Sequence, residues 1–440
     1  MRPEGPDADA SGRSHDQPMK IAKAILIDPD RNLAYGTAAI ALSLFVFAYS
    51  TLFGKIPILI YYAIWFPLVL VDYRRVLGNF PRTYWILPFG ILACLSVFWS
   101  QAPGVSARAA IQFATHILCA FIAARTISIR TFTLGTLIGI SLVVLYSLAF
   151  GSYHYDPFDG DFSFSGAFAS KNLLGFFCSI GIYFAFACIF VLRERLLWCG
   201  LAVICAGLSG YALIASHSAT ALITTIAALA VLIGLGGLTP FRPRTRKTLA
   251  IFGILLGIGV AMAAMALGGF DFILAAFGKN TTLTGRTYLW SQGLAAAANA
   301  PMFGVGYQAY WVPGFPDAER LWAEFYITTQ TGFHFHNTYI ETLVEVGAVG
   351  VLLLAIVLIR TSAGFLVRFL ANRNDATARI MLGLLAMLLL RSVVEVDVIA
   401  PYALGSFLLY YSAALLAAPQ FRQVTAQAVQ PATVWTLDAR

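Results

Sequence analysis

This chain contains an arginine that could bind an anion and a histidine that could accept a proton. Arg286 follows a glycine and opens a short helical pattern, and His336 lies directly before a long apolar run. The planar guanidinium of arginine binds phosphate oxygens in pairs. Histidine titrates near neutral pH, so it can accept the proton of an attacking hydroxyl. We therefore predict that Arg286 and His336 are catalytic, beside an aromatic segment that is compatible with sugars.

Further polar residues are candidates for substrate binding. Asn337, Glu341 and Glu345 are spaced four apart, which puts them on one face of a helix. A carboxylate about two turns into a membrane span is costly unless it is paired or faces a wet cavity. We expect Glu341 or Glu345 to fix the tautomer of His336 or to bind sugar hydroxyls. The predicted substrate-binding residues are Lys171, Asn172, Arg108, Glu341, Glu345 and Arg391.

Each candidate also has a structural interpretation. Arg286 could contact lipid phosphates, and His336 could hydrogen-bond at a helix start. Glu341 and Glu345 could be ion-pair partners, and Lys171 could extend along its apolar stem to the membrane interface. The six cysteines lie inside apolar runs, and no Asp, Glu or His cluster has convincing metal-ligand spacing. We predict neither a metal nor a cofactor.

The composition places these residues in a membrane protein. Of 440 residues, 59% are hydrophobic and only 11% are charged. Because a soluble domain carries roughly 25% charged residues, this composition excludes a soluble enzyme, a disordered protein and a nucleic-acid partner. A membrane-crossing helix needs about 20 apolar residues, and the sequence therefore predicts an all-α polytopic protein with twelve transmembrane helices. The predicted spans are 33–53, 56–71, 84–100, 105–124, 131–150, 172–192, 196–215, 218–238, 249–269, 338–359, 377–394 and 399–418.

The distribution of Lys and Arg predicts the orientation. With the N-terminus inside, the inner segments hold 22 of these residues and the outer segments 7, which favours a cytoplasmic position for both termini. We predict cytoplasmic tails at 1–32 and 419–440 around a transmembrane domain of residues 33–418. The large loop 270–337, between spans nine and ten, then lies on the periplasmic face of a bacterial inner membrane.

The outer loops carry the mixed composition that is typical of functional segments. Within 270–337, we expect short helices at 287–299 and 317–328, separated by a tight turn at 304–307. The other long outer segment, 151–171, is expected to be a loop.

These motifs resemble the O-antigen ligase and polymerase superfamily (Wzy/WaaL-like). The run from His336 to Gly350 is similar to the signature of that family, and 285–290 with 301–306 resembles its partner motif. Further matches lie at 99–103, 166–175 and 391–397. The pairs Lys171-Asn172 and Glu395/Asp397 are most similar to the ExoQ-like exopolysaccharide polymerases. Ser216-His217-Ser218 departs from the pattern, since family members often carry an arginine there.

The resemblance implies a GT-C-like membrane glycosyltransferase that is inverting and metal-independent. Its donor would be a glycan on undecaprenyl diphosphate, presented at the outer face of the inner membrane. The acceptor would be a sugar hydroxyl, on lipid A core in a ligase or on a second lipid-linked glycan in a polymerase. Membrane lipids would surround the protein. We favour a polymerase of O-antigen or exopolysaccharide repeats, with protein O-glycosylation as a third option.

Two other functions fit parts of the sequence. A polysaccharide transporter or lipid-linked-sugar flippase would suit twelve spans, but the two halves of the chain are dissimilar and the reactive residues gather at one membrane face. Gly207-Leu-Ser209-Gly210 matches a pattern of intramembrane serine proteases, although no histidine lies in a suitable later span. Small residues are common in membrane helices, so this match is weak.

Overall fold

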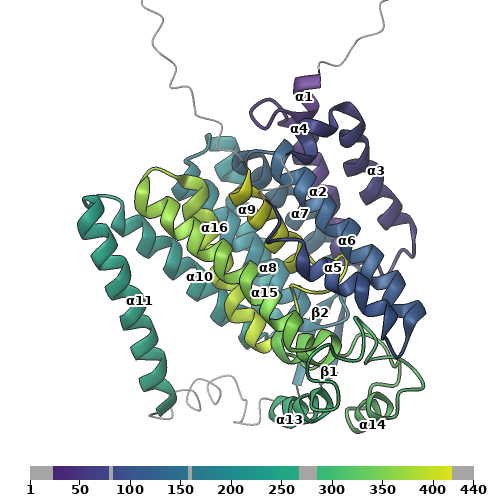
Figure 1. The fold of residues 1–440 in the computed structure, drawn as a ribbon. Coiled ribbons are helices and arrows are strands. Elements are labelled where there is room, and N and C mark those ends of the chain that lie inside the picture. The colour runs from purple at the N-terminus through teal and green to yellow at the C-terminus, as the bar shows by residue number, and fades with distance from the viewer. Residues whose placement is uncertain (1–22, 79–82, 157–160, 267–284, 419–440) are drawn as a thin grey trace, which may run out of the picture.

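The computed structural model describes residues 23–78, 83–156, 161–266 and 285–418. The predicted C-terminal tail, most of the N-terminal tail and the first part of the large outer loop lie outside these residues. The described chain is helical apart from one short hairpin (Figure 1).

The helices and strands follow one another in this order: α1 (Lys23–Ile27), α2 (Ala34–Tyr49), α3 (Ile56–Val71), α4 (Tyr73–Leu77), α5 (Pro88–Leu95), η2 (Ser96–Phe98), α6 (Pro103–Thr126), α7 (Ile129–Phe150), β1 (Ser152–Asp156), β2 (Asp161–Gly166), α8 (Lys171–Phe186), η3 (Ala187–Leu192), α9 (Leu196–Ala215), α10 (Ala219–Leu238), α11 (Pro243–Ala266), α13 (Arg286–Ala297), α14 (Pro316–Glu324), α15 (Thr338–Ala371), α16 (Ala376–Val394) and α17 (Leu404–Ala417).

Each predicted span overlaps a helix of this structure, although the helices within 84–100 and 399–418 are shorter than the predicted spans. Among the described residues, seven helices are long and apolar enough to cross a membrane, and four apolar helices are shorter. The protein is therefore a polytopic helical membrane protein, as the composition indicates. The number of spans that cross the membrane stays a prediction, since length and composition alone decide these assignments.

The centre of the bundle is α17. Every residue from Leu404 to Ala414 is buried, which is the pattern of a helix that is enclosed by others on all sides. It packs against α6, α2, α15 and α16, while α8 packs on α7 and α9, and α10 packs on α16. The burial of apolar side chains around α17 organises the helices that carry the polar residues at one end of the bundle.

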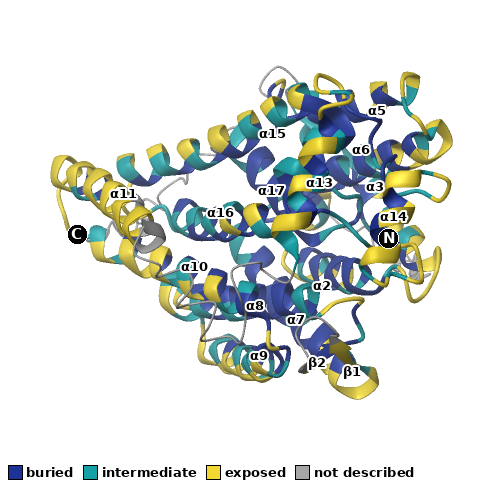
Figure 2. Ribbon diagram, turned by 90° about the horizontal axis from the view of Figure 1, so that it is seen from below, coloured by how far each residue is buried: buried dark blue, intermediate teal, exposed yellow. Residues whose placement is uncertain are grey.

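The helix α11 stands apart from this core (Figures 1 and 2). It is held near its start by Arg246, which donates from Nη2 to the carbonyl of Leu370 at 2.6 Å and lies over the ring of Phe369. Most of its described apolar side chains are exposed, including Ile251 and Phe252. Such a helix is stable only in an apolar surrounding, which agrees with a membrane location.

The long helix α15 is broken at Gly347, whose φ of 70° and ψ of −172° are not helical. The segment before α14 pairs with the break. The N–H of Gly306 donates to the carbonyl of Glu345 at 2.8 Å, and the N–H of Ala348 donates to the carbonyl of Pro301 at 2.9 Å. These bonds satisfy backbone groups that the break would otherwise leave unpaired. They also fix the outer loop against α15.

Residues of the segment 285–344 form a second, smaller core, in which α13 and α14 pack with the loops around them. Its buried residues include Leu289, Tyr310, Trp322 and Phe335. The two short helices predicted here are confirmed, with bounds of Arg286–Ala297 and Pro316–Glu324. They lie at the end of the molecule opposite α1 and α4 (Figure 1).

The loop predicted at 151–171 contains a short hairpin, which was not predicted. The antiparallel strands β1 and β2 form a hairpin there, in which Tyr153 faces Phe164 and Tyr155 faces Phe162. Alternating aromatic residues are typical of strands, and cross-strand aromatic pairs stabilise such a hairpin.

Candidate functional site

Several helix ends meet on the side of the molecule that carries α13 and α14. They are the starts of α8, α13 and α15 and the end of α16. The side chains that join them come from segments far apart in the sequence. A polar cluster, which we define as Arg286, His336, Glu395 and Asn172, occupies this junction.

Arg286 is the first residue of α13. Gly285 before it adopts a left-handed conformation with φ of 83°, which glycine tolerates best. The guanidinium donates from Nη1 to the carbonyl of Val394 at 2.7 Å and from Nη2 to Oε1 of Glu395 at 2.8 Å. The Arg286 side chain is 13% exposed. Because these bonds use only part of the N–H donors of a guanidinium, the group can still bind an anion.

His336 lies just before α15 in a left-handed conformation, with φ of 51°. Such a backbone is unusual for a residue other than glycine and is concentrated at functional sites. Its Nδ1 atom lies 3.4 Å from Oε2 of Glu395, and its side chain is 26% exposed. A carboxylate beside Nδ1 favours the tautomer with the proton on Nδ1. The other ring nitrogen, Nε2, is then the basic one.

The ring of His334 lies beside that of His336, with 4.2 Å between the centroids and 60° between the ring planes. Its Nδ1 accepts the backbone N–H of His336 at 3.0 Å. Burial, followed by the neighbouring His336, lowers the pKa of His334 to about 3. Burial and the Arg286 guanidinium also lower the pKa of His336, against the opposing effect of Glu395. Both imidazoles are therefore neutral at neutral pH.

Glu395 connects the cluster. Its Oε1 accepts from Arg286 and, at 2.9 Å, from Nδ2 of Asn172, while Oε2 lies beside His336. Ser218 donates in turn to Oδ1 of Asn172 at 2.8 Å. Burial alone would raise the pKa of Glu395, but the Arg286 charge and the His336 contact outweigh it and hold that pKa well below its usual range. The carboxylate is therefore ionised.

The residues that follow His336 attach the start of α15 to the end of α16. Asn337 caps α15 by accepting the N–H of Ile340 at 3.1 Å, and its Nδ2 donates to the carbonyl of Val393 at 2.9 Å. Thr338 donates from Oγ1 to the carbonyl of Glu395 at 2.7 Å. These bonds fix the imidazole of His336 next to the carboxylate of Glu395.

Arg391, predicted to bind substrate, is 1% exposed. It donates from Nε to Oδ2 of Asp397 at 2.6 Å, and its guanidinium carbon lies 4.1 Å from the ring centre of Phe176. In this structure its side chain holds the segment that carries Glu395. The sequence spacing could not distinguish this buried position from an exposed one.

Glu341 and Glu345 have different partners from those expected. Glu341 accepts from Trp311 Nε1 at 2.9 Å and from the N–H of Phe335 at 2.8 Å. Glu345 lies 3.5 Å from Nε2 of Gln308. Both are buried, and among the contacts of the described residues none joins them to His336. The carboxylate beside His336 is Glu395, which the sequence placed only within a family motif.

The other two predicted cations lie at the same end of the molecule. Lys171 is the first residue of α8, adjacent to Asn172, and is partly buried. Arg108 is exposed in the first turns of α6. In the described part of the chain, no hydrogen bond or ion pair joins Arg108 to the polar cluster.

One group of side chains has the spacing of metal ligands. Ligand atoms of His334, His336 and Glu395 lie within 4.8 Å of one another. Nδ1 of His334 already accepts an N–H, and Glu395 already neutralises Arg286. A metal cation here would have to compete with the guanidinium for the carboxylate. The donor set fits a metal poorly, and the absence of a metal in the reaction stays a prediction.

Comparison with known proteins finds a matching family model and a similar protein. Residues 202–355 match the family model described as O-antigen ligase. The chain is 53% identical over 405 residues to the exopolysaccharide production protein ExoQ of Rhizobium meliloti (strain 1021), and the match covers 92% of this chain and 93% of that protein.

Proposed function

This chain belongs to the ExoQ-like family of O-antigen ligase-related proteins, and from that premise we propose that it is a membrane glycosyltransferase that polymerises an exopolysaccharide repeat. The similarity to ExoQ, an exopolysaccharide production protein, supports this proposal. The transfer from undecaprenyl diphosphate to a sugar hydroxyl, and the roles of individual residues, are our proposal.

The electrostatics of the polar cluster support an anionic leaving group. The starts of α8, α13 and α15 meet there, and a helix start carries a partial positive charge that favours anions. Arg286 adds a full charge and keeps N–H donors beyond those bonded to Val394 and Glu395. We propose that the donor diphosphate binds here, with Lys171 at the start of α8 as a further cation.

The proposed reaction is a single displacement. Nε2 of His336 takes the proton of the acceptor hydroxyl as its oxygen attacks the anomeric carbon. The bond between that carbon and the phosphate oxygen breaks on the opposite side, so the configuration inverts. Undecaprenyl diphosphate leaves with the electron pair, and Arg286 stabilises its charge. Glu395 stabilises the imidazolium that forms, and it keeps the ring in its orientation.

The observation that carries this proposal is the chain of contacts from Arg286 through Glu395 to His336. It joins a phosphate-binding group to a base through one carboxylate, at one end of the helices. A transporter that alternates its access would need binding groups near the bilayer midplane. The cluster at the helix ends therefore favours transfer chemistry over transport.

The test is transfer by the purified protein in vesicles that contain a lipid-linked repeat. We expect elongated lipid-linked glycan and free undecaprenyl diphosphate, and the same yield in the presence of EDTA. Loss of activity in EDTA that magnesium or manganese restores would contradict the metal-free mechanism. Absence of any elongation by the folded protein in these vesicles would contradict the polymerase assignment.

The proposed orientation has its own test, since it decides whether the cluster can meet the donor. Reporter fusions after Tyr310 should behave as periplasmic, and fusions after Arg244 as cytoplasmic, in agreement with the 22 inner and 7 outer basic residues. The reverse result at either position would put the cluster on the wrong side of the membrane.

A further inference from the structure

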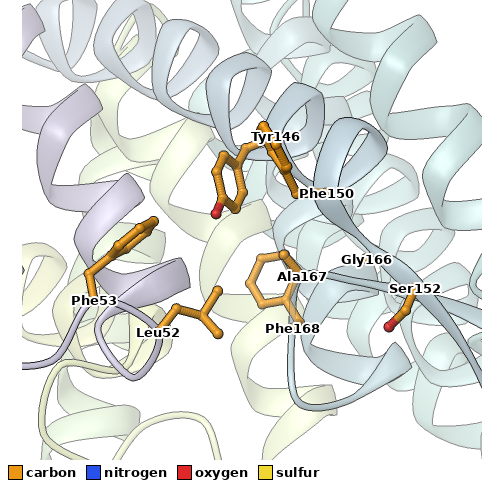
Figure 3. Close-up of a pocket in the computed structure, with 8 residues that line it drawn as sticks. All are labelled: Leu52, Phe53, Tyr146, Phe150, Ser152, Gly166, Ala167 and Phe168. Carbon is orange, nitrogen blue, oxygen red and sulfur yellow. The ribbon is translucent and has the colours of Figure 1, made fainter.

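A second feature of the outer end is an apolar pocket of about 460 Å³, separate from the polar cluster. Leu52 and Phe53 form one wall, just after α2, and Tyr146 and Phe150 form another at the end of α7 (Figure 3). Phe168 closes it from the segment between β2 and α8. Four of the eight lining residues are aromatic and one, Ser152, is polar, so the pocket suits a largely apolar ligand.

The pocket opens at the side of the bundle. Leu52, Phe53 and Phe150 are exposed, with 54%, 45% and 72% of their surface accessible. All of them lie at the outer ends of apolar helices, which is the level of the outer membrane interface. A ligand can therefore enter from the membrane, with its polar head on the outer face.

The rear wall of the pocket leads to the polar cluster. It consists of Gly166, Ala167 and Phe168, and the N–H of Ala167 donates to Oγ of Ser147 at 3.2 Å. Asn172, which binds Glu395, follows Phe168 by four positions. Since an extended residue spans at most about 3.6 Å, the backbones of Phe168 in the pocket and Asn172 in the polar cluster are at most about 14 Å apart. The head of a ligand in the pocket can reach the cluster.

We propose that this pocket binds the polyprenyl chain of the acceptor, a second lipid-linked glycan. The inference rests on the proposed function, because a polymerase has two lipid-linked substrates and each needs a place at the outer interface. Arg286 on α13 is the leaving-group cation, and α13 lies well apart from the hairpin beside the pocket (Figure 2). A chain held on the hairpin side would bring its sugar towards His336 from the start of α8, whereas the departing diphosphate would be bound at Arg286 at the start of α13.

The shape of the pocket favours a branched chain. Straight acyl chains cover every apolar helix face of a membrane protein and need no cavity. A methyl-branched chain is wider, so it can make more van der Waals contacts with the rings of Phe53, Tyr146 and Phe168. We therefore expect the pocket to prefer a polyprenyl lipid to the surrounding phospholipid.

The experiment is site-specific photocrosslinking, which requires no transfer. The photoreactive residue p-benzoylphenylalanine replaces Phe53 in the full-length protein, in phospholipid vesicles that contain undecaprenyl phosphate at a low mole fraction. The matched control places it at Phe98, an equally aromatic and more exposed position of η2 outside the pocket. We expect the polyprenyl lipid to be enriched at least tenfold over its mole fraction at position 53 and not at 98.

The second part of the experiment fills the pocket with larger side chains. Leu52→Trp, at an exposed position, should remove the enrichment at Phe53 while the protein stays folded, and Ala167→Phe from the rear wall should do the same. Crosslinks at position 53 that mirror the bulk lipid, or that are enriched in phospholipid, would overturn the proposal. The His336→Ala protein should still show the enrichment. If the unmodified protein showed the enrichment but transferred no sugar, that result would contradict the proposed function and leave the proposed pocket standing.

Discussion

Two buried carboxylates near the start of α15, Glu395 and Glu341, differ in the groups that surround them. Glu395 contacts Arg286, His336 and Asn172, all of which belong to different helices. Glu341 instead receives the indole N–H of Trp311 and a backbone N–H within the outer loop. Glu395 contacts a charged and a titratable side chain, whereas Glu341 stabilises the loop that precedes α15.

The difference shows that closeness in the chain is a poor guide to partnership here. Glu341 follows His336 by five residues, yet its oxygens are occupied by the loop. Glu395 follows by 59 residues and reaches the imidazole because Asn337 and Thr338 attach α15 to the end of α16. The comparison predicts opposite consequences when each carboxylate is changed.

The largest effect is expected for Glu395→Gln. The amide cannot stabilise an imidazolium or neutralise Arg286, and it can reverse the tautomer of His336. Transfer should fall by about 10²–10⁴ at normal protein abundance. The measurement is the initial rate of glycan elongation in vesicles, normalised to folded protein. A Glu395→Gln protein with normal activity would remove the distinction between the two carboxylates.

Arg286→Lys should follow closely. Lysine keeps the charge but lacks the planar fork, so it cannot bind Glu395 and a phosphate at once. Loss of one charge-stabilising donor corresponds to about 10²–10³ in rate. Arg320→Lys is the matched control, because Arg320 makes its ion pair with Glu324 on the exposed surface of α14. Equal impairment of both variants would argue that Arg286 has only a structural role.

The pH dependence tests the electrostatics of the same cluster. Burial and Arg286 lower the pKa of His336, so its neutral, basic form persists below the usual value of about 6.5. The rate of elongation should therefore decline only when pH falls through that lowered pKa. Glu395 opposes the shift, so Glu395→Gln should move the residual acid limb to still lower pH. A decline of the rate with a midpoint at or above pH 6.5 in the unmodified protein would contradict a base whose pKa is lowered.

The smallest effect on transfer is expected for Glu341→Gln. The amide oxygen can still accept one of the two N–H groups, and the other then lacks a partner, which costs about 1–3 kcal/mol of stability. Thermal unfolding in detergent should shift to lower temperature, while the rate per folded molecule changes less than tenfold. A loss of transfer as large as that of Glu395→Gln, without loss of stability, would assign Glu341 to the reaction.

Much of this architecture follows from local properties of the sequence. Apolar runs fix the positions of the helices, and Arg286 and His336 are recognisable from residue type and from their places beside a glycine and before an apolar run. The role of Glu395 depends on tertiary contact across 59 residues, which no local pattern encodes. Arg391 has the residue type of a substrate ligand, but packing against Phe176 and pairing with Asp397 bury it. The hairpin within 151–171 was not predicted, although the alternating aromatic residues of its strands are a local signal for it.

The central claim is that His336 is the base of the transfer reaction, and its most direct test is His336→Ala in the vesicle assay. The variant should bind the lipid-linked donor normally and lose about 10²–10⁴ in the rate of elongation. His334→Ala, which alters the neighbouring imidazole, is the matched control and should retain most of the activity. Full elongation by His336→Ala at normal abundance, or loss of activity only in His334→Ala, would contradict the account.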